Sequence, residues 1–336
     1  MTGALRTVLL GAGKSGRLFA AALAANPQVD LRVVVSGRGG SAAEIASEVG
    51  AESMVAGEDW SLIHPDLVVV ATPHDQHEQQ TLTALTAGAS VLVDKPVVTT
   101  GDSWTRVFEA SRTHGRVFCA FVQRCSPAVL TCREYLRARR PQITGMSIQQ
   151  ILARDATYYT TWKGNFAQSG GGVLMNQAIH ALDLAQFVTS GQMTLNGALM
   201  WTPPEIDVET VVTATLTMDG AIPVILSATT SSAVNEQQLI RVCLGDEMVL
   251  LVGSEVVSWA GTTPAVAGSE DVESLIAALG RGGDRYGPGH RAAVDDVVTS
   301  ILAQSDSIYE LELSQVEETH RLVYEMYDFA SSGRRS

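Results

Sequence analysis

Short apolar runs alternate with longer, partly polar segments over the first 121 residues of this 336-residue chain. Runs rich in valine and leucine, without polar alternation, are typical of strands buried on both faces of a parallel sheet. The expected strands are 5–10, 31–35, 67–71, 90–93 and 116–121, and the expected helices are 17–25, 76–87 and 104–113. This alternation predicts an α/β domain with a doubly wound parallel sheet.

The second half of the chain shows alternating or β-branched runs that are separated by turn residues such as Asp219-Gly220. This pattern predicts further strands, at 208–218, 222–230, 238–244 and 248–251. Amphipathic spacing predicts two helices, at 294–303 and 315–330. Because 336 residues exceed the usual size of one domain, the two patterns indicate two domains.

The letters GAGKSG stand between the first expected strand and the first expected helix, as a dinucleotide-binding turn requires. Gly11 allows the tight turn, Gly13 lets the backbone approach a pyrophosphate, and Gly16 lets the helix pack on the strand. Lys14 and Ser15 lie within this turn and are further candidate cofactor contacts, because the free N–H groups at the start of the helix attract phosphates. The turn alone also fits other α/β proteins. The second expected strand, 31–35, follows the first at the sequence distance of one βαβ unit, and this favours a nucleotide-binding site.

Ser36-Gly37-Arg38 follows the second expected strand, where a carboxylate usually binds the ribose diol of NAD. A hydroxyl and a guanidinium stand there instead. The guanidinium of Arg38 suits the 2′-phosphate of NADP, which a carboxylate would repel. The segment therefore favours NADP, with NAD as the alternative cofactor and a solvated loop arginine as the alternative interpretation.

Polar residues also follow two later strands of the expected sheet. Thr72, Pro73 and His77 lie where one strand ends and a helix begins, and Asp94 and Lys95 end the next strand. Ligands of such sheets bind at the carboxyl ends of the strands. These residues are therefore candidate cofactor contacts, and His77 has the alternative of capping its helix.

Composition limits the partners of this chain. Its formal net charge of −13 disfavours nucleic acid and anionic membranes, because both attract basic surfaces. The four cysteines show no CxxC spacing and indicate reduced thiols, not a disulfide frame or a zinc site. Neither a signal peptide nor a membrane-spanning apolar stretch is recognisable, so we expect a cytoplasmic protein.

A second glycine cluster, at 170–172, leads into a segment that carries Asn176, His180 and Asp183. In a helix these three polar side chains lie near one face. Imidazole titrates near neutral pH, so His180 is a candidate for proton transfer, and a buried structural histidine is the alternative. A transition metal is disfavoured, because asparagine is a poor ligand and no cysteine joins the group.

Several stretches together resemble the Gfo/Idh/MocA family of glucose–fructose oxidoreductases and inositol dehydrogenases. They are GAGKSG, ATPHDQH, VDKP, GGGVLMNQAIHALD and GPGHRAAVDDV. The resemblance implies an N-terminal Rossmann domain at 1–124. It also implies a substrate-binding and oligomerisation domain at 125–336, an α/β domain with a large, mostly antiparallel open sheet. A homo-oligomer, either a dimer or a tetramer, is expected on the same ground.

The resemblance further implies hydride transfer between NADP or NAD and a carbinol or ketone carbon of a sugar-like or polyol substrate. By position, Lys95 matches the family's lysine beside the nicotinamide, and His180 matches its catalytic histidine. Asn176 stands where many inositol dehydrogenases have aspartate, and its amide can hydrogen-bond a substrate hydroxyl. The remaining expected contacts are Tyr158 and Trp162 to the substrate and Gln123 to the cofactor.

Two other functions fit the same fold. Some relatives act on imines or cleave glycosides without net redox turnover, and others are nucleotide sensors without catalysis. Net consumption of NADP(H) would separate a dehydrogenase from a glycosidase. Because this chain has both Lys95 and His180, the sequence favours an enzyme over a sensor.

Overall fold

The computed structural model describes residues 3–37, 41–245, 247–258 and 289–332, and the chain divides into two compact units. The first unit contains the residues up to Val122 together with Pro288–Glu317. The second contains Gln123–Gly287 and Glu318–Ser336. Among the described residues, no helix is long and apolar enough to cross a membrane.

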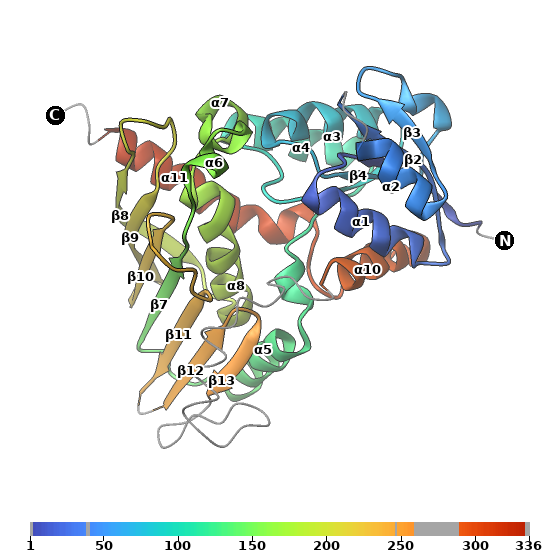
Figure 1. Ribbon diagram of the computed structural model, residues 1–336. Coiled ribbons are helices and arrows are strands. Elements are labelled where there is room, and N and C mark those ends of the chain that lie inside the picture. Colours follow the sequence, from blue (N-terminus) through green and yellow to red (C-terminus); the bar gives the residue numbers. More distant parts are fainter. Residues whose placement is uncertain (1–2, 38–40, 246, 259–288, 333–336) are drawn as a thin grey trace. The chain divides into compact units, whose positions relative to one another are not determined.

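The first unit is built on a six-stranded parallel sheet with the order β3-β2-β1-β4-β5-β6 (Figure 1). Its strands are β1 (Leu5–Leu10), β2 (Val29–Ser36), β3 (Glu52–Val55), β4 (Leu67–Val70), β5 (Ser90–Val93) and β6 (Val117–Cys119). Every residue of β4 is fully buried, as expected of a strand that is covered on both faces. The strand order reverses between β1 and β4, which confirms the predicted doubly wound sheet.

The helices of this unit include one that comes from far along the chain. They are α1 (Lys14–Ala24), α2 (Ser41–Val49), α3 (His77–Thr86), α4 (Gly101–His114) and α10 (Gly289–Ala303). Helix α10 packs on α1, where the rings of Phe19 and His290 meet edge to face at 4.9 Å between centroids. Asn26 also donates to the Asp295 carboxylate at 2.8 Å. The sequence analysis predicted α10 as a helix but did not place it against α1.

The second unit is built on a seven-stranded sheet with the order β13-β12-β11-β7-β10-β9-β8. Its strands are β7 (Gly145–Ile151), β8 (Met193–Trp201), β9 (Val211–Met218), β10 (Ile222–Thr229), β11 (Leu239–Leu244), β12 (Glu247–Val252) and β13 (Glu255–Ser258). Among the strands that the structure describes here, only β7 and β10 pair in parallel, which confirms the mostly antiparallel sheet. The sequence analysis found β9 to β12 and missed β7, β8 and β13.

Helices cover one face of this second sheet (Figure 1). The longer ones are α5 (Pro127–Arg139), α8 (Ile179–Thr189) and α11 (Leu313–Ser332), and the short ones are α6 (Ala156–Tyr159) and α7 (Phe166–Ser169). Residues 179–188 of α8 are all buried, because this helix lies between the sheet and α5. The opposite sheet face exposes large apolar side chains, namely Leu199, Trp201 and Ile225.

Candidate functional site

The first glycine turn joins β1 to α1 in the first unit. Gly11 has φ +108° and donates its N–H to the Val35 carbonyl at 2.8 Å. A β-carbon at Gly11 would overlap the carbonyl oxygen of Ala71, and one at Gly16 would overlap the carbonyl oxygen of Gly11. Both positions therefore require glycine, because backbone of the same unit occupies the space that a side chain would need.

Gly13 differs from both, because no atom lies within 4 Å of the place where its β-carbon would stand. Helix α1 begins at Lys14 without a side-chain cap and without an acidic residue in its first turn. The first N–H groups of the helix and its positive dipole end are thus left for a ligand. This open backbone surface fits the pyrophosphate of a nicotinamide dinucleotide.

The segment expected to select the cofactor is only partly described. Ser36 ends β2 half-buried, and its hydroxyl donates to the Gly37 carbonyl at 3.1 Å. Arg38 lies outside the described residues. The expectation that it binds a 2′-phosphate therefore stays a prediction.

His77 lies beneath the ends of β4 and β5. Its ring is fully buried, with Nδ1 at 2.8 Å from the Pro96 carbonyl and Nε2 at 2.9 Å from the Thr72 carbonyl. A neutral imidazole has one N–H, so it donates to one of these carbonyls at a time. Burial lowers the pKa of His77. This placement favours a structural role that ties the two strand ends together.

The hydrogen bonds of His77 hold the backbone next to Lys95 in place. Asp94 continues the sheet by donating its N–H to the Val70 carbonyl at 2.8 Å, and its carboxylate accepts the Lys95 N–H at 2.8 Å. Both residues are half-buried. The hydroxyl of Thr72 donates to the Gln80 side chain at 2.6 Å, and Pro73 precedes a short 3-10 turn. The predicted residues of the two strand ends therefore sit on one hydrogen-bonded framework.

The second glycine cluster, in the second unit, packs against a buried carboxylate. Glu209 accepts the N–H groups of Gly172 and Leu174 at 2.8 and 2.9 Å, and the Tyr327 hydroxyl donates to it at 2.8 Å. A β-carbon at Gly172 would overlap the Glu209 backbone, and one at Gly171 would overlap the Tyr327 hydroxyl. The glycines are thus required by close packing. Burial raises the pKa of Glu209, and the two N–H groups oppose that shift.

A π-helical turn, Leu174–Ala178, separates the cluster from α8. The amide of Asn176 lies in this turn and donates to the Gly171 carbonyl at 3.0 Å. Gln177 and His180 line a pocket that does not include Asn176.

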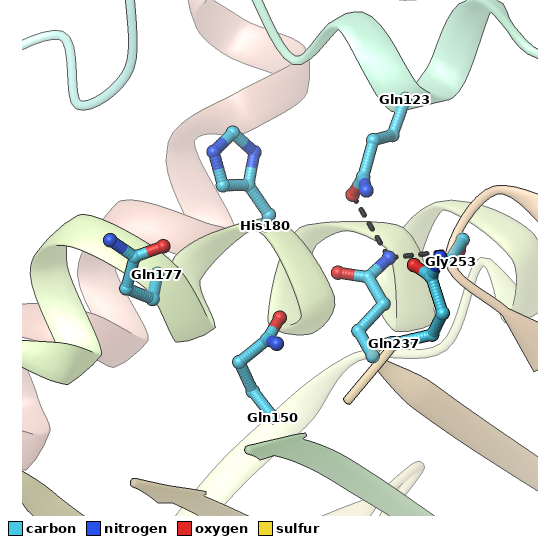
Figure 2. Close-up of a pocket in the computed structure, with 7 residues that line it drawn as sticks. Gln123, Gln150, Gln177, His180, Gln237 and Gly253 are labelled. Atoms are coloured by element: carbon cyan, nitrogen blue, oxygen red, sulfur yellow. Dashed lines mark hydrogen bonds between the residues drawn. The ribbon is translucent and has the colours of Figure 1, made fainter. Parts of the chain in front are cut away.

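That pocket encloses about 310 Å³ of space in the second unit, part of it open to solvent (Figure 2). Its lining residues are Gln123, Gln150, Gln177, His180, Gln237, Gln238 and Gly253. The side-chain amide of Gln238 donates to Gln123 at 3.0 Å and to the Gly253 carbonyl at 2.9 Å. The pocket thus combines an imidazole with several carboxamides, which both donate and accept hydrogen bonds.

An aromatic cluster adjoins the pocket through Gln177. The amide of Gln177 donates to the Tyr158 hydroxyl at 3.0 Å, and the Lys163 ammonium lies 4.9 Å from the Tyr158 ring centre. The same ammonium lies 5.7 Å from the ring centre of Trp162. Tyr158 and Trp162 therefore both lie near the Lys163 ammonium, and neither lines the pocket. Their expected contact with the substrate stays a prediction.

A buried ion pair supports α8 beyond His180. Arg124 is 2% and Asp183 1% exposed, and they form two hydrogen bonds of 2.9 and 2.6 Å. The Thr319 hydroxyl also donates to Asp183 at 3.2 Å. Burial raises the pKa of Asp183, and the Arg124 guanidinium opposes that shift. The geometry is structural, because it joins α8 to the segments before and after it.

Two family profiles match this chain. The description "Oxidoreductase family, NAD-binding Rossmann fold" covers residues 5–121, and "GFO/IDH/MocA C-terminal domain" covers residues 143–249. The chain belongs to the GFO/IDH/MocA oxidoreductase family. The resemblance drawn from the sequence motifs is thereby confirmed.

Several curated relatives of this GFO/IDH/MocA member are sugar or polyol dehydrogenases by name. Levoglucosan dehydrogenase of Pseudarthrobacter phenanthrenivorans is 28% identical over 223 residues, covering 59% of this chain and 55% of the relative. Inositol 2-dehydrogenase of Rhizobium meliloti is 25% identical over 185 residues, covering 55% and 54%. The matched stretches thus span about half the length of these relatives.

A solved structure supports the fold over nearly the whole chain. The WlbA dehydrogenase from Bordetella pertussis, solved with NADH and UDP-GlcNAcA, has a TM-score of 0.85. It is 20% identical, and the match covers 98% of this chain and 96% of that one. At this identity the likeness concerns the fold alone.

The sequence analysis of this GFO/IDH/MocA member missed most of the pocket lining. Gln150, Gln237 and Gln238 lie on β7 or just before β11, in segments without a recognisable motif. Gln123 lines the pocket, and its expected contact with the cofactor stays a prediction. Among the described residues, no group of three His, Cys, Asp or Glu side chains could hold a metal ion.

Proposed function

We propose that this protein is an NAD(P)-dependent oxidoreductase that transfers a hydride between nicotinamide and a carbinol or ketone carbon. The substrate is a sugar-like or polyol molecule. The observation that carries the proposal is His180, a titratable group at a pocket lined by hydrogen-bonding carboxamides, in a member of an oxidoreductase family. The names of the curated relatives support the substrate class.

The open turn at Gly13 supports binding of the dinucleotide. The residues that would hold it are Gly11, Gly13, Lys14, Ser15, Gly16, Ser36, Arg38, Thr72, Pro73, Asp94 and Lys95. Bound nicotinamide supplies or accepts the hydride. The Arg38 guanidinium favours NADP over NAD because it can pair with a 2′-phosphate.

In this proposal His180 transfers the proton, and Lys95 stabilises charge on the substrate. His180 takes the hydroxyl proton in oxidation and returns it in reduction, because imidazole titrates near neutral pH. The Lys95 ammonium stabilises negative charge on the substrate oxygen. Asn176 orients the turn before His180 through its bond to the Gly171 carbonyl.

A turnover screen tests the activity. Purified protein is mixed with NADP⁺ or NAD⁺ and a panel of sugars and polyols, and reduced nicotinamide is measured by absorbance. We expect Lys95→Ala and His180→Ala to lower kcat/KM by about 100-fold or more. His114→Ala, an exposed change at the end of α4, is the control. Nucleotide binding without turnover of any substrate would contradict the enzyme and favour a sensor.

Fluorescence titration with NADPH and NADH tests the cofactor preference. We expect tighter binding of NADPH, and loss of that preference in Arg38→Ala. Arg32→Ala, an exposed change on β2 near the same segment, is the matched control and keeps the preference. Equal binding of the two nucleotides by the unmodified protein would contradict the role of Arg38.

We further propose a homo-oligomer that forms through the open face of the second sheet. Leu199 is 77%, Trp201 54% and Ile225 55% exposed there, which is unusual for large apolar side chains on a monomer surface. Light scattering should show a dimer or a tetramer, and Trp201→Lys should shift it toward the monomer. The four cysteines are free, which supports a reducing compartment such as the cytoplasm.

A further inference from the structure

Lysine is rare in this chain. Its 23 lysine and arginine residues comprise 3 lysines, at positions 14, 95 and 163, and 20 arginines. Two of the lysines already belong to the proposed function, Lys14 in the first glycine turn and Lys95 after β5. An ammonium is a compact point charge with three donors, unlike the planar guanidinium. A lysine at position 163, in a chain that otherwise uses arginine, points to a requirement of the same kind.

Lys163 is one of two cations at the ring of Tyr158. The Lys163 ammonium lies 4.9 Å and the guanidinium carbon of Arg154 5.2 Å from the centre of that ring. Tyr158 belongs to α6, and Lys163 belongs to the 3-10 turn Trp162–Gly164 that follows. The aromatic ring attracts each cation, but the two like charges repel each other. An anion close to both of them would therefore be stabilised.

Arg154 forms no ion pair with any carboxylate that the structure describes. Its guanidinium donates to the Asn235 side chain at 3.0 Å. The neighbouring acid, Asp155, caps α6 instead, because it accepts the Thr157 hydroxyl and the Tyr158 N–H at 2.5 and 3.1 Å. In a chain with a net charge of −13, an arginine without an acidic partner offers its charge to a ligand.

The two cations adjoin the pocket of the second unit without lining it. The Tyr158 hydroxyl accepts the amide of Gln177 at 3.0 Å, and Gln177 lines the pocket (Figure 2). Asn235, which accepts from Arg154, lies two residues before Gln237, another lining residue. The described lining itself carries no lysine, arginine or carboxylate side chain. Positive charge is thus concentrated beside the pocket and not within it.

We propose that Lys163 and Arg154 form a subsite for an anionic substituent, a carboxylate or a phosphate, on the molecule that the pocket binds. The proposal rests on the oxidoreductase function and narrows its substrates to sugars or polyols that carry such a group. An ammonium and a guanidinium both donate to the oxygens of either anion. The rings of Tyr158 and Trp162 hold the ammonium beside the pocket through cation–π contacts.

Protection of the lysines from acetylation tests binding without turnover. The full-length protein is treated briefly with acetic anhydride, and mass spectrometry measures modification at each of the three lysines. The anionic probes are D-glucuronate and D-glucose 6-phosphate, and D-glucose is their neutral counterpart. We expect at least one saturating anion to slow acetylation of Lys163 by about 5-fold or more, with Lys14 unchanged as the internal reference. Equal protection by D-glucose, or protection by neither anion, would overturn the proposal.

Turnover with nicotinamide cofactor tests whether the subsite serves the reaction. We expect kcat/KM for the anion that protects Lys163 to exceed that for D-glucose by about 10-fold or more, mainly through KM. Lys163→Met keeps the length of the side chain and removes its charge. It should lower kcat/KM by about 10- to 100-fold for the anion and by less than about 3-fold for D-glucose. Arg139→Met is the matched control, because it removes a cation 4.9 Å from the ring centre of Tyr135 on α5, outside the pocket lining.

The outcomes separate the subsite from the oxidoreductase function. An equal loss for the anion and for D-glucose in Lys163→Met would show a structural role for Lys163 and contradict the proposal. Turnover of D-glucose without turnover of either anion would contradict it as well, while the oxidoreductase function would stand. Protection of Lys163 by an anion without turnover of any probe would instead contradict the oxidoreductase function and support the subsite.

Discussion

The two glycine clusters of this chain look alike in sequence and differ in what surrounds them. At the first, Gly13 borders open space, whereas Gly11 and Gly16 are packed against backbone of the same unit. At the second, Gly171 and Gly172 are closed off by Tyr327 and Glu209. One cluster presents a surface to a ligand, and the other anchors a helix. Glycines in a row therefore do not by themselves indicate a binding turn.

The backbone N–H groups near each cluster show the same contrast. At the start of α1 no side chain of the first turn caps the helix, so its amides can receive an anion from outside. At the second cluster the amides of Gly172 and Leu174 are already bound by the protein's own carboxylate, Glu209. An internal carboxyl group takes the place that a phosphate has in a dinucleotide site, and it holds the segment before His180.

The largest expected effect follows from removing the carboxyl group of Glu209. Glu209→Ala leaves two buried backbone N–H groups and the Tyr327 hydroxyl without their acceptor. We expect the free energy of unfolding to fall by about 3–5 kcal/mol, because unsatisfied buried donors are costly. Urea unfolding followed by circular dichroism measures the change.

Tyr327→Phe sharpens this prediction, because it removes one hydrogen bond and leaves the two backbone bonds to Glu209 in place. We expect a loss of about 1–2 kcal/mol. Equal losses in the two variants, or less than about 1 kcal/mol in Glu209→Ala, would mean that Glu209 does not anchor the cluster.

The next prediction compares two glycines of the first cluster: Gly16 is expected to affect stability, and Gly13 is expected to affect nucleotide binding. Gly16→Ala forces a methyl group against the Gly11 carbonyl, and we expect a loss of about 1–3 kcal/mol in unfolding free energy. Gly13→Ala meets no atom within 4 Å, so its stability should change by less than about 1 kcal/mol. Its methyl group nevertheless stands where a pyrophosphate would approach. We therefore expect its Kd for NADPH to rise by about 10-fold or more.

Thermal unfolding and fluorescence titration of the same two variants measure both quantities. If Gly13→Ala binds NADPH as the unmodified protein does, the open side of the turn does not face the cofactor. If Gly16→Ala is as stable as the unmodified protein, the packing of α1 on β1 tolerates a side chain at position 16. Gly13 and Gly16 would then not differ in their effect on stability.

The sequence was most informative where the physical constraint is local. GAGKSG could be interpreted because the atoms that require Gly16 belong to Gly11, a few residues away. The requirement at Gly171 comes from Tyr327, far along the chain, so the sequence showed the glycine without its reason. Likewise, α10 was recognisable as a helix, but nothing in its periodicity indicates that it packs on α1.

The candidate site shows the same limit. The spacing of Asn176 and His180 predicts an α-helical face, and nothing in that spacing indicates the π turn in which Asn176 lies. Gln150 interrupts the apolar alternation of β7, which concealed that strand from a pattern analysis.

The smallest expected effect concerns His77, which joins two strand ends of the first unit as Glu209 joins elements of the second. Burial lowers the pKa of this ring, so the folded protein binds the proton less readily than the unfolded chain does. Its contribution is therefore fully present above the unfolded pKa of about 6.5 and is lost as the pH falls below that value.

His77→Gln removes the titrating group while keeping an amide that can reach one carbonyl. We expect the unmodified protein to be the more stable of the two at pH 7.5. That advantage should shrink on going to pH 5.5, by at most about 1.4 kcal/mol per pH unit, the limit for one proton. Unfolding curves of both proteins at the two pH values measure the difference. If the advantage is the same at both pH values, the His77 ring titrates alike in the folded and the unfolded protein. The link between the ends of β4 and β5 would then not depend on a neutral imidazole. The link at Glu209 differs, because a carboxyl group makes it.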